Sequence, residues 1–425
     1  MILFFQRIVS FFVSLVLLIP GFFPMETAMR PSEAAPKGTA AERAAELADD
    51  YYRQYYRPGL HLLDRYAYSI AKPASCWEVT GLLSLSTRMA ALDSCKYGWL
   101  LPSVTGCVRH FRRYDGLSFS GHVTEWTVFR GAAQRHSVSY DDMMWLGRDF
   151  VNMYRLTGNS RYISLAREIA DYLIADAYVT LPDEIFTDQG WPAPDGPVAG
   201  YYWNEGKEAV HTCSTRPMAQ FLAMFYNETE EAFYLEKSRE AYRMLQYLEN
   251  SDGTFHDLMR FHKDEDNNIL GFKEHDLAVY TYNSGTPVSS AVELYIATGE
   301  TAYLDDARHW AAAADRRFAQ YNSENDIWVY PRQNTWFHLV LLSGYMDLLP
   351  FDDAAADYLA RFRTGFDYAY ENYRTAGHHG VMRNFMPRDF LNGFNANADY
   401  AHIAQDASSA AEIYAIYALL EQESA

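Results

Sequence analysis

A helix–turn–helix unit occurs three times in this 425-residue sequence and constrains its fold more than any other feature. The copies run over residues 153–162, 224–234 and 294–303. In the first and third, Gly158 and Gly299 follow an apolar segment, at the position where a helix often ends in left-handed geometry. Downstream, apolar residues recur at helical spacing as far as residues 173, 248 and 314. Each copy predicts a helix end, a tight turn and a second helix.

Helices are also expected over residues 41–71, 354–373 and 406–421, whereas the expected strands are few and short, such as 126–130 and 327–330. The three helix–turn–helix copies begin about 70 residues apart, which suits helical hairpins separated by long loops. We therefore predict an all-α fold of antiparallel hairpins closed into a toroid. Residues 74–136 are expected to supply the first hairpins and a wall of the groove.

Long loops gather at one end of such a ring and usually carry its function. The longest predicted loops cover residues 180–208, 250–281 and 378–402, and they are rich in Gly, Pro, Asn, Asp and aromatic residues.

The N-terminal segment has the pattern of an export signal. An apolar run over residues 8–23 follows Arg7, and Ser32-Glu33-Ala34 fits a cleavage site. Pro20-Gly21 interrupts the run, which leaves it short for a membrane-spanning helix. We expect residues 1–34 to be a signal peptide and the protein to be secreted or held at the cell surface; the alternative is an uncleaved membrane anchor. Residues 40–425 would then form one catalytic domain.

Charge excludes some partner classes. The formal net charge is −19 and no Lys/Arg-rich run occurs, so neither nucleic acid nor anionic lipid is expected as a partner. Aromatic residues make up 16% of the chain. Their faces suit stacking on sugar rings, but aromatic residues also fill the seams between helices. Composition does not separate these two interpretations.

The cysteines and histidines point to no metal site. Export would permit disulfides, and four cysteines allow three complete pairings, between which the sequence does not choose. The cysteines are Cys76, Cys95, Cys107 and Cys213. No CxxC, Cys/His or HExxH spacing and no glycine-rich phosphate loop occurs. We expect neither a metal nor a cofactor.

Two adjacent aspartates, Asp141 and Asp142, are the strongest candidates for chemistry. Neighbouring carboxylates repel each other, so their pKa values separate and one site can hold both a base and an acid. The alternative is structural, because aspartates in a first helical turn satisfy free N–H groups and the helix dipole. Segments 200–204 and 280–286 also combine aromatic residues with Asn, as sugar binding requires.

Two motifs carry a resemblance to glycoside hydrolase family 76, the endo-α-1,6-mannanases. Tyr-Asp-Asp-x-x-Trp at 140–145, followed by Tyr-x-x-Thr-Gly-x-x-x-Tyr, resembles the catalytic segment of that family. Tyr-Thr-Tyr-Asn-Ser-Gly at 280–285, followed by Glu-Leu-Tyr-x-Ala-Thr-Gly, resembles its second signature, where Gln is more usual than Ser284. The resemblance implies an (α/α)6 barrel, which agrees with the predicted hairpins.

The family mechanism is retaining and proceeds through a covalent glycosyl-enzyme. By position, the resemblance assigns Asp141 as the nucleophile and Asp142 as the general acid/base. Retention needs carboxyl groups about 5–5.5 Å apart. Side chains that diverge from Cα atoms ~3.8 Å apart can reach this separation.

Further residues are expected to contact the substrate. Tyr282 and Asn283 belong to the second signature, and Asp257 resembles an acidic loop residue of the family that contacts sugar. Trp145 lies one helical turn beyond the aspartates and is either a wall of the site or a core residue. Trp203 and Asn204 fit a binding wall.

One segment departs from the family pattern, and it leaves the identity of the sugar open. Lys207-Glu208 and then residues 211–217 stand where the family often shows Lys-Asn and a later Asn.

The sequence thus predicts a secreted, monomeric, retaining endo-α-mannosidase that acts on a poly- or oligosaccharide of the α-1,6-mannan type. The alternatives are a transglycosylase and a glycan-binding or cell-wall protein without turnover on the same scaffold. A sugar epimerase or uronyl hydrolase is disfavoured, because such enzymes would want a histidine pair or differently spaced carboxylates.

Overall fold

The computed structural model describes residues 38–67, 73–111, 139–266, 268–374, 386 and 403–423. The predicted signal peptide at 1–34 and the predicted strand at 126–130 lie outside these residues. So does the predicted loop at 378–402, except for Met386.

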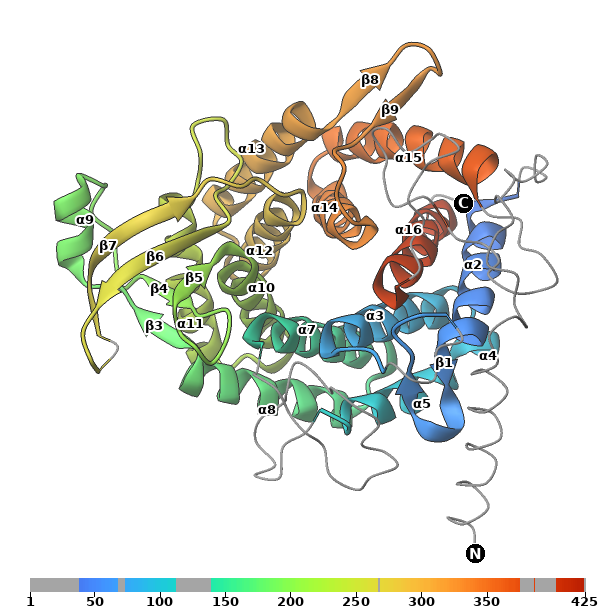
Figure 1. Cartoon of the computed structure of the whole chain (residues 1–425), viewed down its shortest axis with the longest axis horizontal. Coiled ribbons are helices and arrows are strands. Elements are labelled where there is room, and N and C mark those ends of the chain that lie inside the picture. The colour runs from blue at the N-terminus through green and yellow to red at the C-terminus, as the bar shows by residue number, and fades with distance from the viewer. Residues whose placement is uncertain are drawn as a thin grey trace, which may run out of the picture.

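Six helices of the described residues form an inner ring in which each packs against the next and the last packs against the first (Figure 1). They are α3 (Cys76–Leu92), α7 (Tyr140–Thr157), α10 (Thr212–Thr229), α12 (Tyr282–Thr298), α14 (Thr335–Leu348) and α16 (Ala404–Glu423). An outer helix packs against each: α5 (Leu100–Val108), α8 (Ser160–Asp176), α11 (Ala232–Arg243), α13 (Thr301–Phe318), α15 (Ala354–Tyr373) and α2 (Ala40–Tyr55). This arrangement is an (α/α)6 toroid and confirms the predicted fold class.

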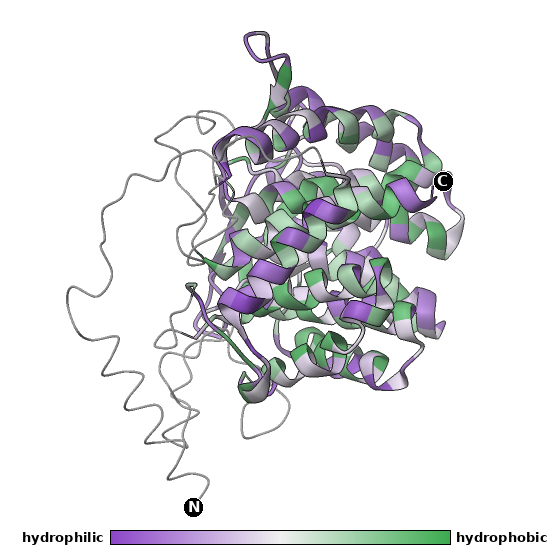
Figure 2. Cartoon of the chain, turned by 90° about the vertical axis from the view of Figure 1, so that its right-hand side faces the viewer, coloured by the Kyte–Doolittle hydropathy of each residue, from purple (hydrophilic) through white to green (hydrophobic). Residues whose placement is uncertain are grey.

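The three predicted hairpins are α7–α8, α10–α11 and α12–α13. Gly158 and Gly299 adopt left-handed φ angles of 67° and 73°, which end α7 and α12 as expected. In α8, Tyr162, Ile169 and Leu173 face the core. Polar and apolar residues alternate along the helices, as expected when one face of each is buried (Figure 2).

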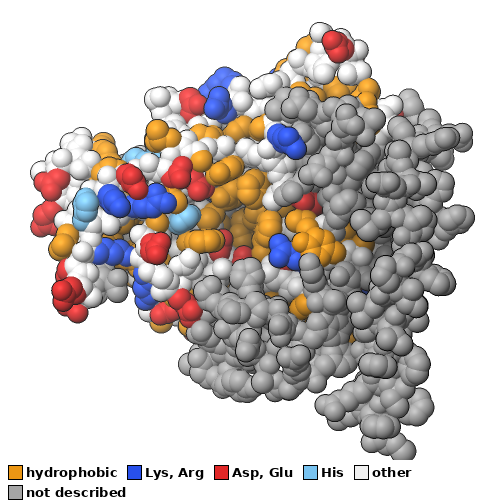
Figure 3. All heavy atoms as spheres, in the orientation of Figure 1, with side chains coloured by type: hydrophobic (Ala, Val, Ile, Leu, Met, Phe, Trp, Pro, Cys, Tyr) orange, Lys and Arg blue, Asp and Glu red, His pale blue; other side chains and the backbone are white. Residues whose placement is uncertain are grey.

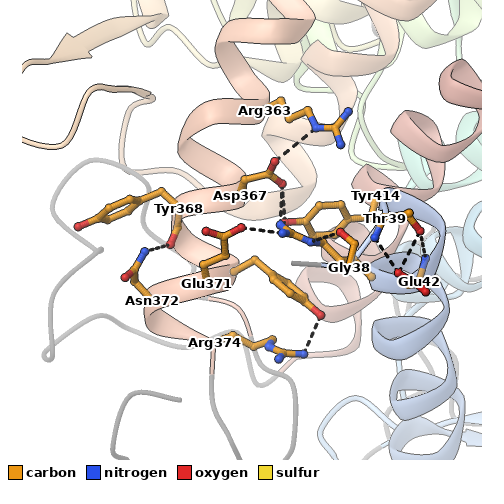
Figure 4. Close-up of polar contacts among 12 residues, drawn as sticks. Gly38, Thr39, Glu42, Arg363, Asp367, Tyr368, Glu371, Asn372, Arg374 and Tyr414 are labelled. Carbon is orange, nitrogen blue, oxygen red and sulfur yellow. Dashed lines mark hydrogen bonds and ion pairs between the residues drawn. The ribbon is translucent and has the colours of Figure 1, made fainter. Parts of the chain in front are cut away.

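Among the described residues, α2 packs against α16 and forms ion pairs with α15 (Figure 4). Arg43 of α2 is buried and pairs with Asp367 and Glu371 of α15, at 2.9 and 2.7 Å. The start of α2 carries a capping box, in which Thr39 and Glu42 satisfy each other's backbone N–H groups. Helix α2 is therefore tied to α15, near the end of the described chain.

The helix predicted over residues 41–71 is wrong over residues 56–67, and its last four residues lie outside the described ones. Helix α2 ends at Tyr55, and β1 (Tyr56–Arg57) pairs with β2 (Leu62–Leu63) around a 3-10 turn at Pro58–Leu60. Proline lacks an N–H donor and disfavours helical geometry in the residue before it. Arg57 accordingly has φ −119° and ψ 85°.

Two of the predicted loops contain regular structure that the sequence did not reveal. Residues 180–208 include α9 (Asp183–Gln189) and β4 (Ala199–Tyr201), and β4 pairs with β3 (Tyr178–Thr180). Residues 250–281 include an antiparallel hairpin of β6 (Leu258–Lys263) and β7 (Ile269–Asp276), to which β5 (Ala209–His211) adds a third strand. Register shifts in β6–β7 disturb the two-residue alternation that would reveal the strands.

Smaller elements complete the fold. The strand predicted at 327–330 is present as β9 (Ile327–Val329), which pairs with β8 (Gln320–Asn322). The described part of 74–136 supplies α3, a short α4 (Ser94–Tyr97) and α5, the expected first hairpin. Within the described ranges, every helix is too short or too polar to cross a lipid bilayer.

Candidate active site

A cavity of about 360 Å³ opens at the end of the toroid where the inner helices begin. First-turn residues of five inner helices line it, together with residues of the connecting segments. The lining residues are Arg65, Ser75, Trp77, Ser139, Asp141, Asp142, Trp145, Trp203, His211, Cys213, Asp257, Tyr282, Trp336 and Phe337. Apolar side chains gather at the centre of the face shown in Figure 3, with acidic side chains among them.

Asp141 is held by contacts from two other segments. Tyr140 donates its backbone N–H to the Trp203 carbonyl at 2.8 Å, which fixes residue 203 beside the start of α7. The Trp203 Nε1–H donates to Asp141 Oδ2 at 2.9 Å, and the Cys213 thiol lies 3.9 Å from the same oxygen. Asp141 Oδ1 is buried and has no hydrogen-bond partner. One carboxylate oxygen is thus anchored by a side-chain donor, and the other lies buried at the cavity wall.

The two aspartates differ in their surroundings and therefore in their acidity. Burial raises the pKa of Asp141 to about 6, and the hydrogen bonds from Trp203, the backbone and Cys213 oppose this rise. Burial raises the pKa of Asp142 well above its ordinary value, and the charges of Asp141 and Glu78 raise it further. At neutral pH this arrangement favours an ionised Asp141 beside a protonated Asp142.

Glu78 is a third carboxylate beside the pair, and the sequence analysis missed it. It is fully buried in the first turn of α3, where it forms a capping box with Ser75. Its Oε1 lies 3.1 Å from Nε of Arg65, the one Lys or Arg among the described residues that line the cavity. A Ser-x-x-Glu pattern marks a helix start, and this signal could have placed Trp77 and Glu78 beside the other helix starts.

Asp257 lies in the segment just before β6. Its Oδ1 accepts hydrogen bonds from the Tyr282 hydroxyl at 3.1 Å and from Asn283 Nδ2 at 2.8 Å. Its backbone bonds to Thr212 and Asp276, which tie it to α10 and to the end of β7. Three helix or strand ends therefore fix this carboxylate at the cavity wall.

Aromatic rings form one wall of the cavity. Trp336 meets Trp145 and Trp77 edge to face, with ring centres 4.9 and 5.5 Å apart. Phe337 packs on Tyr282 with ring centres 4.2 Å apart. Both interpretations of Trp145 hold, since its ring is 3% exposed yet lines the cavity.

Of the eight residues predicted for the site, six line the cavity: Asp141, Asp142, Trp145, Trp203, Asp257 and Tyr282. Asn283 is buried behind the wall and reaches the cavity through Asp257. Asn204 lies off the cavity, where its side-chain oxygen accepts the Gly206 N–H at 2.9 Å and its backbone pairs with Ser139. The other lining residues were not among those predicted for the site: Arg65, Ser75, Trp77, Ser139, His211, Cys213, Trp336 and Phe337.

The remaining polar groups define the chemistry available to the cavity. Burial lowers the pKa of His211 to about 4, so its ring is neutral at physiological pH. All four cysteines are free thiols. In the part of the chain that the structure describes, no three His, Cys, Asp or Glu side chains converge in a way that could hold a metal ion.

Comparison with known families gives one match. The family model described as Glycosyl hydrolase family 76 matches residues 114–347, more than half of the chain. A search of curated protein sequences finds no match.

Solved structures share the fold. A family 76 glycoside hydrolase from a bovine Bacteroides thetaiotaomicron strain superposes with a TM-score of 0.74 at 22% identity, covering 91% of this chain and 78% of that one. The family 76 mannosidase of Bacteroides thetaiotaomicron VPI-5482 gives 0.71 at 22% identity, covering 91% and 100%. An inactive α-1,6-mannanase of Salegentibacter, with two consecutive aspartates replaced by alanine and α-1,6-mannotetrose bound, gives 0.64 at 19% identity, covering 90% and 100%.

Proposed function

The chain belongs to glycosyl hydrolase family 76 and is a glycoside hydrolase, and we propose that it cleaves α-1,6-linked mannose chains internally with retention of configuration. The observation that carries this proposal is the Asp141–Asp142 pair at the cavity, where one carboxyl is anchored by donors and the other faces further negative charge. Two consecutive aspartates were also the residues replaced in the inactive, mannotetrose-bound Salegentibacter enzyme.

In the first half of the reaction, the Asp141 carboxylate attacks the anomeric carbon of the sugar bound in the cavity. Trp203 and Cys213 hold Oδ2, which fixes the orientation of this carboxylate. Asp142 gives its proton to the departing glycosidic oxygen as that bond breaks. The product is an ester between the sugar and Asp141, and Asp142 is left as a carboxylate.

In the second half, Asp142 takes a proton from a water molecule as the water attacks the same carbon. The ester bond breaks, Asp141 returns to a carboxylate and Asp142 is protonated again. Because the carbon is attacked twice, the released sugar keeps its original configuration. The aromatic wall of Trp77, Trp336 and Phe337 supplies faces on which sugar rings can stack.

We also propose that the enzyme acts outside the cell. A mannan is too large to enter a cell, so a secreted or surface-held enzyme fits the signal pattern of residues 1–34. We propose that the enzyme acts as a monomer on poly- or oligosaccharides and uses no cofactor.

The test is digestion of linear α-1,6-mannan, with the anomeric configuration of the first products followed by proton NMR. We expect short mannose oligomers that appear first in the α configuration. Asp141→Asn and Asp142→Asn should each abolish them. Asp149→Asn is the matched control, because Asp149 is a buried aspartate of the same helix that does not line the cavity.

Other outcomes would redirect the assignment. Products of inverted configuration, or activity that survives both substitutions, would refute the mechanism. Products longer than the starting chain would identify a transglycosylase. Saturable binding without products would identify a glycan-binding protein, and cleavage only of other α-glycans would refute the α-1,6-mannan assignment.

A further inference from the structure

Arg216 is a fully buried arginine of α10, packed directly behind the cavity wall. Its guanidinium carbon lies 3.3 Å from the centre of the Phe255 ring. Nη1 donates a hydrogen bond to the backbone carbonyl of Asn283, while Nε and Nη2 are buried without partners. No carboxylate of the described residues forms an ion pair with it.

Stability alone gives no reason to keep such a residue. A buried charge is costly unless it is paired and fully hydrogen-bonded. Burial lowers the pKa of Arg216 well below its ordinary value, and the charges of Glu249 and Tyr282 oppose this only in part. An arginine nevertheless stays protonated in a protein. Apolar residues of similar volume are often tolerated equally well or better at such positions.

The one hydrogen bond that the Arg216 side chain makes among the described residues leads to the cavity. Its acceptor, Asn283, donates through Nδ2 to Asp257, and Asn283 Oδ1 has no partner of its own. The orientation of the Asn283 amide therefore depends on where its backbone is held. Arg216 also brings a positive charge behind a cavity that contains Asp141, Asp142 and Asp257.

We propose that Arg216 is a positioning residue for glycan binding, which fixes Asn283 and through it presents Asp257 to the sugar. Its positive charge lies behind the wall of an acidic cavity. This inference rests on the proposed function, because that function places a glycan in the cavity that Asp257 lines.

The test compares Arg216→Met and Arg216→Lys with a control, Arg155→Met. Arg155 of α7 is paired with Glu293 and Glu228 at 2.8 and 2.7 Å and lies away from the cavity. Three properties are measured: the melting temperature, amide hydrogen exchange in peptides covering 254–259 and 281–285, and affinity for α-1,6-mannotetraose. The affinities are measured in the Asp141→Asn/Asp142→Asn background, so that the ligand is not cleaved.

We expect Arg216→Met to melt no lower than the parent and to exchange faster in those two peptides only. It should bind the tetrasaccharide about tenfold more weakly, as when one hydrogen bond to a charged group is lost. Arg216→Lys should recover part of the affinity, because an ammonium can still donate to the Asn283 carbonyl. Arg155→Met should lower the melting temperature and leave the affinity unchanged.

A double-mutant cycle shows whether Arg216 acts through Asp257. In an Asp257→Ala background, Arg216→Met should weaken binding by less than about twofold. An equal loss in both backgrounds, or a lowered melting temperature with unchanged affinity, would overturn the proposal. If the parent binds no α-1,6-mannan oligosaccharide, the proposed function fails, and the exchange data alone then test the role of Arg216. Unchanged exchange at 254–259 would refute the positioning role. Selectively faster exchange there would support it.

Discussion

Replacing Trp203 by phenylalanine tests how the nucleophile is tuned. The substitution keeps an aromatic ring that can pack against His211, whose ring centre lies 5.3 Å from that of Trp203. It removes the Nε1–H that donates to Asp141 Oδ2 at 2.9 Å. That hydrogen bond stabilises the ionised form and holds the pKa of Asp141 down against burial. Without it, the pKa of Asp141 should rise.

The magnitude follows from the strength of that hydrogen bond. A hydrogen bond to a charged group contributes about 1.5–3 kcal/mol. Trp203 is 40% exposed, so water can replace part of the interaction and the lower end, about 1.5–2 kcal/mol, applies. At 1.36 kcal/mol per unit, this raises the pKa of Asp141 from about 6 to about 7–7.5.

The consequence appears at acidic pH, because only the ionised carboxylate attacks. At pH 6 the ionised fraction of Asp141 should fall from about half to about 3–10%, which reduces kcat/KM about 5- to 15-fold. At pH 8 most of the activity should return, because that pH lies above the pKa of Asp141 in both the parent and the variant. The acidic limb of the pH profile therefore moves to higher pH.

The assay is kcat/KM on α-1,6-mannan from pH 4.5 to 9, with Trp191→Phe as the matched control. Trp191 stacks on His275, and it does not line the cavity. Its replacement should leave the acidic limb in place. An unmoved acidic limb in Trp203→Phe, with activity lowered equally at every pH, would refute the tuning role and leave Trp203 as a sugar-binding wall.

Three further predictions follow from the same geometry. Glu78→Gln keeps a side chain that can cap α3 but removes a charge that raises the pKa of Asp142. Asp142 should then lose its proton at lower pH, so the alkaline limb of kcat/KM should move to lower pH. An unchanged limb would show that Glu78 does not influence the acidity of Asp142. Asp142→Ala should process an aryl α-mannoside with a good leaving group through the first step and accumulate glycosyl-Asp141, detectable by mass spectrometry; absence of the ester would contradict the assigned roles. Gly285→Ala would place a Cβ 2.3 Å from the Val340 carbonyl, so urea unfolding should show a loss of about 1–3 kcal/mol or more, whereas Gly271→Ala, which meets nothing within 4 Å, should be far milder.

The hairpins were predictable because their signals are local. Gly158 and Gly299 end their helices, and the apolar spacing that follows depends only on residues of the same helix. The prediction failed where a local signal was overlooked, since Pro58-Gly59 ends the helical geometry soon after Tyr55. The β5–β6–β7 sheet was missed for a different reason, because shifts in strand register disturb the two-residue alternation by which a strand is recognised.

Much of the cavity was not predictable from the sequence, because ring closure assembles it. Trp77 and Trp336 lie at the starts of helices far apart in the chain and become neighbours only when α16 joins α3 and α14 in the ring. In the sequence each is a single aromatic residue near a helix start, and its pattern does not distinguish a cavity position from a core position. Only their shared place in a first helical turn relates them to Asp141 and Asp142.

The difference between the two aspartates is likewise in part a tertiary property. Asp141 and Asp142 share almost the same local sequence. Within α7, backbone hydrogen bonds lower the pKa of Asp141 and its charge raises the pKa of Asp142. Residues distant in the chain widen this separation: Trp203 donates to Asp141, while Glu78 adds negative charge near Asp142. Family resemblance assigned the nucleophile and the acid by position alone. The surroundings supply a physical cause for the same order, because the residue with the donors ionises first. Trp203→Phe and Glu78→Gln should therefore act on opposite limbs of one pH profile.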